Sequence, residues 1–569
     1  MSSQQTVFPA ATRADWDAMA TKVLRGAAIE TLTLHDEDNL PVHALYPVVA
    51  EAADHVAKII APGGKVADRL AYGWDVAQPV WVPNDSAAID RANQIILDAL
   101  ESGATGLILW LAPGASARFA QLFDRVTLSA ISLYLCGEEE RVTAYDALLG
   151  YAASVGVAPD ALRVTLGGDG VTRGVADSKI TEVLQAVGAA APRHIFDLNG
   201  LAWHHRGATA AAEIGLILAT AASLLRAAPD PAVLARHLSA TIGLSADILA
   251  GVVKIRALRL GWAGLLDAFG LNPEEYPLFI TAMPGLRIFT LLDEDTNMLR
   301  ITTALLAGAL GGADRMASWG HNVLSGEGDA ARRFARMSQL LLIEESGIGR
   351  SLDVAAGAPA LEMRTDALAA AGWSVMQAIE AAGGITAAAA RDEIDQMIAN
   401  DATARAARFA AITANEDSRM VGVTWQPSAA PRASLNPVMA AHWAEIQRPA
   451  ARVEALRQSA LDQPRRIVIL RPTEGDSALD TRAEERQITN WLAIAGLTAV
   501  GLQDNAATAL ATARPDVVIM LAGAIIPEAY EGRVIDAAAI VAATDQLTGL
   551  EQIVDGTVIS IPDGEVRNG

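Results

Sequence analysis

The chain is poor in cysteine, in aromatic residues and in positive charge. Cys136 is the one cysteine among 569 residues, which excludes an internal disulfide and suits a reducing cytoplasm. Lysine and arginine total 44 against 66 aspartate and glutamate residues, and the net charge of −22 repels phosphate backbones. Because no basic cluster offsets this charge, we expect no nucleic-acid partner.

Long apolar runs and a leader pattern are also missing. Residues 1–13 are polar and lack the basic-then-apolar order of a signal peptide. The longest apolar helix candidates, 214–225 and 301–310, are shorter than the roughly 20 residues that span a bilayer. Hydrophobic residues still make up 51% of the chain, enough for a large core. We therefore expect a soluble, cytoplasmic protein of two or three domains with no membrane partner.

Residues 1–50 are predicted to form an N-terminal arm without a core of its own. A short helix places Trp16, Met19 and Val23 on one face. Stretches 30–34 and 42–46 alternate like a hairpin across a turn at 36–39. Such an arm must pack on the next domain or on a partner. Its apolar residues are Phe8, Trp16, Val23, Leu32, Leu34, Leu45 and Tyr46.

Strand and helix patterns alternate eight times within residues 51–395. This alternation predicts an α/β fold, an eight-stranded parallel β/α barrel of the TIM type, with further helices packed outside it. The expected strands are 74–82, 106–112, 130–135, 162–166, 194–198, 240–244, 278–283 and, most weakly, 315–319. The expected helices are 87–100, 115–126, 142–155, 175–187, 208–226, 246–269, 297–310 and 329–345.

A second, smaller α/β unit is predicted over residues 464–569. It follows a helical linker at 396–463, in which Pro427, Pro431 and Pro437 mark an extended part before a helix at 439–461. Short β-branched strands are expected at 467–470, 498–502, 516–521 and 557–561, with a helix at 484–495.

Four motifs follow one another between Lys254 and Arg350. They are Lys254-Ile255-Arg256-Ala257, the pattern Asn297-x-x-Arg300-x-Thr302, the pair Gly311-Gly312, and Glu344-Glu345-Ser346. Helix capping explains several of these residues singly. In this order, however, they resemble the acyl-CoA mutase domain of the methylmalonyl-CoA mutase family. The resemblance implies that 464–569 is a flavodoxin-like domain of the cobalamin-binding type.

Two sites that the resemblance implies are replaced in this chain. Catalytic mutases carry Tyr-His after the fifth strand, and the register of Gly207-Ala208-Thr209 puts Leu201 and Ala202 at those positions. An alanine cannot donate a hydrogen bond to a thioester carbonyl. The family ligates cobalt through Asp-x-His-x-x-Gly, yet the last histidine here is His442. We therefore expect no catalytic, cofactor-binding or metal residue, and a degenerate C-terminal domain.

The resemblance thus implies a small, non-catalytic subunit of a heterodimeric methylmalonyl-CoA mutase, an isomerase. Its partner would be the large catalytic chain, which binds adenosylcobalamin and interconverts (R)-methylmalonyl-CoA and succinyl-CoA. Two alternatives stay open. The chain could be a self-sufficient, cobalamin-independent barrel enzyme that uses Asp169, His204 or His321 at the barrel mouth. It could also be a regulatory binder that acts transiently on a mutase.

Aromatic residues on the strands predict a filled barrel. Family barrels leave a passage for the coenzyme A chain, whereas these strands carry Trp81, Trp110, Tyr134, Phe196 and Phe279. Because strand side chains alternate in direction, some of these rings should point inward. The alternative is that all of them face the helices.

Other candidate patterns have simpler explanations. His204-His205 could be a metal pair, but adjacent side chains diverge, so a loop at the barrel rim is expected there. The glycines at 167–170, with Gly174, hint at phosphate binding but are better explained as turn residues. Pro62-Gly63-Gly64-Lys65 is no P-loop, because Ile59 and Val66 break the pattern. Cys136 is expected to be a small hydrophobe at a strand end.

Overall fold

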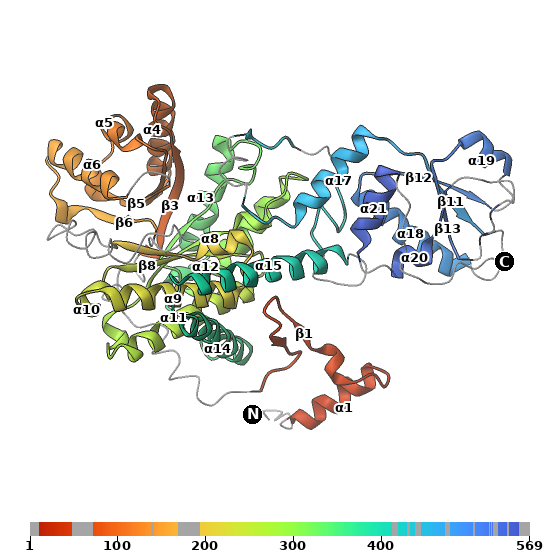
Figure 1. The fold of residues 1–569 in the computed structure, drawn as a ribbon, viewed down its shortest axis with the longest axis horizontal. Helices are drawn as coiled ribbons and strands as arrows, with labels where there is room; N and C mark the ends of the chain where they lie inside the picture. Colours follow the sequence, from red (N-terminus) through yellow and green to blue (C-terminus); the bar gives the residue numbers. More distant parts are fainter. Residues whose placement is uncertain are drawn as a thin grey trace, which may run out of the picture.

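An eight-stranded parallel sheet curls into a barrel, and a four-stranded parallel sheet follows it in the chain (Figure 1). The computed structural model describes residues 11–47, 72–137, 141–168, 194–411, 419–428, 433–437, 445–472, 478–503, 507–522, 524, 526, 533–542 and 545–556. The predicted fold class is confirmed. The domain boundaries stay predictions.

All eight predicted barrel strands form, each within about two residues of its expected bounds. Their order is β6-β5-β4-β3-β10-β9-β8-β7, and every pairing is parallel. Between β6 and β7, Leu166 N donates to His194 O at 2.9 Å and His194 N donates to Val164 O at 3.2 Å. This short bridge nearly closes the barrel. The strands are β3 Asp75–Val82, β4 Gly106–Leu111, β5 Ser132–Gly137, β6 Arg163–Leu166, β7 Phe196–Asn199, β8 Leu238–Leu244, β9 Phe279–Pro284 and β10 Arg315–Ala317.

Helices cover the outside of this sheet because the outward strand residues are aliphatic and buried. The first of them begins at the N-cap Asp85, whose carboxylate accepts from Ala88 N at 2.9 Å. The predicted helix 115–126 is one 3₁₀ turn and the short α5, and the predicted helix 175–187 lies outside the described residues. The helices are α4 Ser86–Glu101, α5 Phe119–Leu122, α6 Arg141–Ser154, α8 Gly200–Arg206, α9 Ala210–Ala227, α10 Pro231–Ala235, α11 Ile248–Ala268, α12 Thr296–Gly311, α13 Asp329–Glu344, α14 Pro359–Ala381 and α15 Ala388–Ala410.

Helix α9 is apolar on almost all sides because other helices surround it. It packs closely against α14 and α11 (Figure 1). By length and composition α9 could cross a membrane, but 83% of that stretch is buried inside the protein. It is therefore a core helix by its surroundings.

The motif residues between Lys254 and Arg350 hold the scaffold together. Arg256 is fully buried, and it donates to Glu362 Oε2 at 2.6 Å and to Asp353. Asn297 bridges the end of the β9 loop, since its Oδ1 accepts from Thr290 N at 3.1 Å and its Nδ2 donates to Thr290 O at 2.9 Å. These residues fix α11, α12 and α14 to the barrel.

The N-terminal arm divides into two parts. Helix α1 Arg13–Val23 has no buried residue, and Met19 and Val23 are 71% and 78% exposed. A hairpin forms about the predicted turn, but its strands are the shorter β1 Leu34–His35 and β2 Pro41–Val42, and Ile29–Leu32 of the expected first strand is a 3₁₀ helix. The hairpin lies on the barrel unit (Figure 1). Phe8 lies outside the described residues.

The C-terminal sheet has the order β12-β11-β13-β14, which matches the first four strands of a flavodoxin-like sheet. Its strands are β11 Ile467–Arg471, β12 Ala499–Gln503, β13 Val517–Met520 and β14 Val534–Asp536. Sequence reasoning missed β14, and the strand expected at 557–561 lies outside the described residues. The helices of this unit are α18 Ala478–Ile494, α19 Ala507–Ala513, α20 Ala537–Ala542 and α21 Gln546–Asp555.

Helix α17 Ala450–Asp462 connects the two units and lies between them in Figure 1. On the barrel side, buried Glu454 accepts from Leu291 N at 2.9 Å and from both Nη atoms of Arg448 at 2.8 Å. On the other side, Arg452 forms ion pairs with Glu551 at 2.7 Å and Asp545 at 3.1 Å. The connector is thus bonded to both units.

Replacing Arg256 with Met should destabilise the barrel strongly. The substitution would leave the nearly buried carboxylates of Asp353 and Glu362 without a cation, which typically costs about 3–5 kcal/mol. The matched control is Arg333→Met at an exposed position of α13, expected to stay within about 0.5 kcal/mol of wild type. Urea unfolding measures both, and equal stability of the two variants would contradict the scaffold role.

Candidate functional site

Three ionisable side chains meet at the carboxyl ends of β7 and β8, where barrel enzymes hold reacting groups. Glu213 of α9 is completely buried, and its Oε1 accepts from Gly243 N at 3.1 Å. Its Oε2 lies 3.2 Å from Nδ1 of His204 and pairs with Lys254. Lys254 Nζ also donates to Gly243 O at 2.7 Å. The cluster joins α8, α9 and α11 to β8.

Burial controls the charges in this cluster. Burial, and then the charges of Arg287 and Lys254, lower the pKa of His204 well below its usual value. The imidazole is therefore neutral, and the Nδ1 proton points to Glu213. Burial also raises the pKa of Glu213 and lowers that of Lys254, against their mutual attraction.

The His204 ring is enclosed by two glycines. A Cβ at Gly243 or at Gly285 would overlap the ring, and the one at Gly285 would meet Nε2. Nε2 is buried and has no hydrogen-bond partner in the described part of the chain. The ring is thus packed against backbone, away from any space that a substrate could enter.

The other sequence candidates do not assemble around His204. His205 Nε2 accepts from Leu286 N at 3.0 Å, and burial lowers the pKa of His205 to about 3. His321 lies 3.8 Å from Asp295, and Asp169 is outside the described residues. The segment expected as a rim loop is helix α8, in which Leu201 is buried and Ala202 half-buried. Neither of these two side chains carries a polar group.

Arg315 crosses the barrel interior. Its Nε donates to Asp75 Oδ2 at 2.7 Å at the start of β3, and its Nη1 lies 3.5 Å from Thr165 Oγ1 on β6. In the strand order β6 lies opposite β10, so this side chain spans the axis. Its guanidinium lies 5.2 Å from the Phe279 ring centre and 6.0 Å from that of Tyr134.

The predicted inward aromatics are confirmed in part. Tyr134 Oη donates to Asp197 Oδ2 at 2.7 Å inside the barrel, and burial raises its pKa well above the usual value. Trp110 lies 6.1 Å from Trp319, and Trp81 shares its face of the sheet through direct pairing. Phe196 instead faces outward, 4.9 Å from the Arg141 guanidinium of α6.

The described residues offer no metal or cobalt site. No group of three or more His, Cys, Asp or Glu side chains among them could hold a metal ion. Half-buried Cys136 places its Sγ 3.5 Å from Leu109 O, as suits a small residue at a strand end. At the carboxyl end of β11, Arg471 pairs with Glu485 at 2.6 Å and lies against Gly501. Guanidinium and carboxylate do not fit an imidazole-ligated cobalamin.

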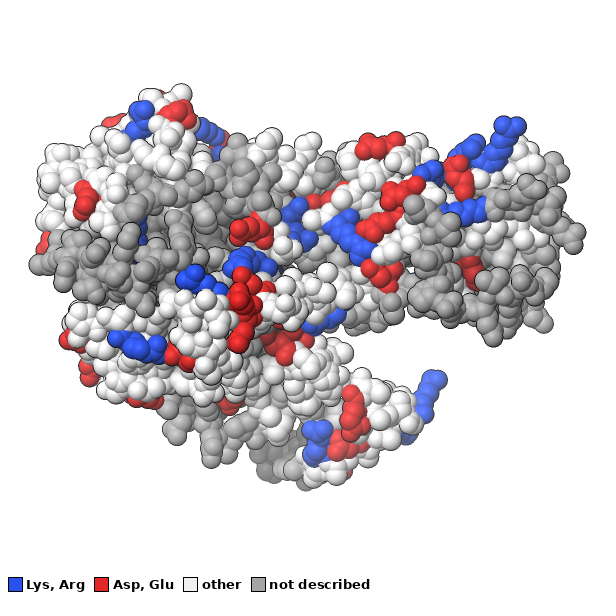
Figure 2. Space-filling model, viewed as in Figure 1, with Lys and Arg blue, Asp and Glu red and all other residues white. Residues whose placement is uncertain are grey.

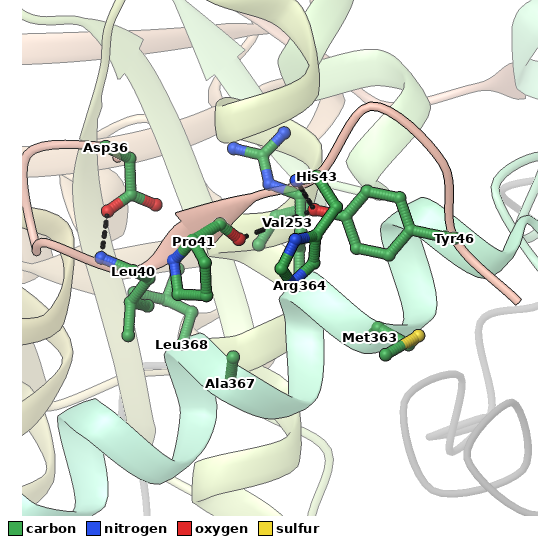
Figure 3. A pocket seen from close by; sticks show the side chains of 10 residues that line it. All are labelled: Asp36, Leu40, Pro41, His43, Tyr46, Val253, Met363, Arg364, Ala367 and Leu368. Carbon is green, nitrogen blue, oxygen red and sulfur yellow. Dashed lines mark hydrogen bonds between the residues drawn. The ribbon is translucent and has the colours of Figure 1, made fainter. Parts of the chain in front are cut away.

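A small crevice lies between the N-terminal hairpin and α14 (Figure 3). Its volume is about 110 Å³, and the hairpin side is bonded internally, since Leu40 N donates to Asp36 Oδ1 at 2.9 Å. Apolar residues dominate the floor, so the crevice has little chemistry to offer a ligand. The lining residues include Leu40, Pro41, Val253, Ala367 and Leu368.

Sequence reasoning missed Glu213 and Arg315. A single glutamate in the otherwise apolar helix α9 was a usable signal, because a carboxylate there needs a buried partner. Arg315 gave no local signal, since its partners are 240 and 150 residues away in the chain.

The chain is similar to mutases along most of its length. The family described as methylmalonyl-CoA mutase matches residues 101–466. The methylmalonyl-CoA mutase small subunit of Streptomyces virginiae is 32% identical over 409 residues, covering 67% of this chain and 65% of that protein. The small subunit of Propionibacterium freudenreichii subsp. shermanii is 27% identical over 467 residues, covering 73% and 70%. The large subunit from that organism is 28% identical over 233 residues, covering 40% and 32%. The chain thus spans less than two thirds of the Streptomyces protein.

Replacing Gly285 with Ala should lower stability, because the new Cβ meets His204 Nε2. Overpacking of this kind costs about 1–3 kcal/mol. In a His204→Ala background most of that cost should disappear, a coupling that a double-mutant cycle of urea midpoints measures. Gly150→Ala is the control. Gly150 is an exposed position of α6, and a Cβ there meets nothing within 4 Å. Equal costs in both backgrounds would refute the enclosed ring.

Proposed function

The chain belongs to the methylmalonyl-CoA mutase family, and we propose that it is the small, non-catalytic subunit of a heterodimeric mutase. On this proposal the large partner chain carries adenosylcobalamin and interconverts (R)-methylmalonyl-CoA and succinyl-CoA. This chain supports the partner's structure. We place the complex in the cytoplasm, in keeping with a single cysteine.

The observation that carries this proposal is the filled barrel. Arg315 and its partners lie across the axis along which the family's catalytic barrels pass the coenzyme A chain. At the mouth, Leu201 and Ala202 stand at the positions of the family's Tyr and His. Side chains therefore fill the passage, and the position of the hydrogen-bond donor to the thioester is held by a residue that cannot donate.

A self-sufficient barrel enzyme is the weaker alternative. Its best candidate, His204, is enclosed between Gly243 and Gly285 and faces no open space.

A transient regulatory binder would differ in its interface, which would be small and polar, whereas an obligate pair of this size should bury several thousand Å². The charged residues on the face in Figure 2 are mixed in sign and form no single basic patch.

Assembly with a catalytic mutase chain tests the proposal. We expect a one-to-one complex with the large chain and, because the family's arm wraps the other subunit, a weaker complex when residues 1–46 are deleted. We expect the interface to bury Trp16, and truncating an aromatic anchor that an interface buries often costs about 2–4 kcal/mol. Light scattering of mixtures of the two chains measures both effects.

A shorter deletion separates the two parts of the arm. Removing residues 1–27 takes away α1 but keeps the hairpin, so it should weaken the complex as much as the longer deletion if α1 is the contact. If both truncated chains assemble as well as the full-length chain, the arm does not contribute to the interface. If the full-length chain does not assemble either, the subunit proposal fails.

Adenosylcobalamin should not bind tightly to this chain alone. The sequence has no histidine beyond His442 to ligate cobalt, and Arg471 with Glu485 occupies the end of β11. Titration followed by absorbance and calorimetry should show no saturable binding and no histidine-ligated spectrum. Micromolar one-to-one binding would contradict the degenerate C-terminal domain.

A further inference from the structure

The turn of the N-terminal hairpin is bonded to the mouth of the barrel. Glu37 accepts from Arg405 through both carboxylate oxygens, at 2.8 and 3.1 Å, and lies 3.5 Å from Arg287 Nη2. Arg408 donates to the carbonyl oxygens of Asp36 and Glu37 at 3.0 and 3.1 Å. Asp38 Oδ1 accepts from Ala211 N, in the first turn of α9, at 3.0 Å.

The two arginines that hold Glu37 belong to the barrel and not to the arm. Arg287 Nη1 donates to His204 O and to Ala208 O at 2.9 Å each, and Arg405 Nη1 donates to Gly207 O at 2.9 Å. Their side chains are only 8% and 10% exposed. Burial, and then the charge of Arg405, lower the pKa of Arg287 to about 10. Glu37 is therefore the carboxylate placed between two neighbouring, nearly buried cations.

Glu37 itself is 46% exposed, and an ordinary surface ion pair contributes little to stability. This pair differs because it is bidentate and its arginines are fixed by backbone carbonyls. Burial would raise the pKa of Glu37, but the hydrogen bond from Arg405 and the charges of Arg287 and Arg405 lower it to about 2. The carboxylate stays charged at neutral pH, so it remains the counter-charge of both arginines.

An apolar contact supports the same placement. Leu40 and Pro41 of the hairpin lie over Ala367 and Leu368 of α14 (Figure 3). Helix α1, in contrast, buries none of its residues within the part of the chain that the structure describes. The arm thus has a fixed half and a free half.

We propose that Glu37 is a positioning residue that anchors the hairpin to the carboxyl end of its own barrel and so fixes where α1 is presented to the partner chain. Because the hairpin is already ordered before binding, less conformational entropy is lost when α1 binds the partner. The inference rests on the proposed function for the identity of the partner, but the anchor itself does not.

The test is hydrogen exchange of residues 34–46 in the full-length chain and in Glu37→Gln. The variant keeps the size of the side chain and removes its charge. Hairpin amides such as Leu40 N should exchange about tenfold faster or more, because the charge-assisted hydrogen bonds that hold the hairpin are lost, while barrel amides stay unchanged. Glu30→Gln is the control, because Glu30 is exposed in the same arm.

Two further results would overturn the anchor. Hairpin exchange as slow as in wild type would show that Glu37 does not hold it. A loss of protection in hairpin and barrel alike would show that Glu37 supports the fold and not the arm alone. Arg405→Gln removes the same bidentate contact from the other side and should likewise speed hairpin exchange, with any further change confined to the region of Gly207, whose carbonyl oxygen Arg405 also bonds.

Association with a catalytic mutase chain separates this inference from the proposed function. Glu37→Gln should weaken the affinity about tenfold if it frees α1, because binding must then also order that segment, and Glu30→Gln should leave the affinity unchanged. A loosened hairpin with unchanged association would refute the positioning role. If wild type does not associate at all, the proposed function fails, while the exchange data still decide the anchor.

Discussion

The ion pair of Arg315 with Asp75 determines what this barrel can do. A parallel sheet that closes on itself must either fill its axis or line a passage. Here a guanidinium lies inside it, and a buried charge requires partners on every side. Asp75 supplies the counter-charge and is itself held by Thr105 Oγ1 at 2.6 Å and by Ser132. Burial would raise the pKa of Asp75, but Arg315 and these hydroxyls lower it, so the pair stays ionised.

The recognisable motifs of the chain therefore indicate its fold more than its chemistry. Arg256 ties α11 to α14, and Asn297 ties α12 to the loop after β9. Lys254 belongs to the enclosed cluster with Glu213 and contacts no open space. On the proposed function, a sequence can keep all of these bonds while Leu201 and Ala202 stand where catalytic mutases carry Tyr and His, because the two sets are different side chains. Architecture and activity are separable for that reason.

The sequence predicted the barrel strands well because aliphatic, β-branched runs between turn residues are local signals. One local signal was missed: the segment of Trp203 and His204 looked like a loop, yet Asn199 caps a helix there by accepting from Ala202 N at 3.2 Å. The other failures came where the determinant was non-local. Arg315 and Glu37 were not singled out at all, because their partners are 150 to 368 residues away. Alternation showed that some rings point inward but not which ones.

Arginines at the junctions explain how a chain with a net charge of −22 holds three parts together. The hairpin meets Arg287 and Arg405. Arg448, just before α17, donates to Phe289 O of the barrel, and Arg452 of α17 pairs with Glu551 of α21. In each case the guanidinium bonds a group from a segment far apart in the sequence, and its planar, forked donors suit bidentate contacts with carboxylates. The acidic excess is then left for the surface. Because these junctions are specific in geometry and charge, the hairpin, the barrel and the C-terminal unit are held in a defined arrangement, which is the property that a supporting subunit requires.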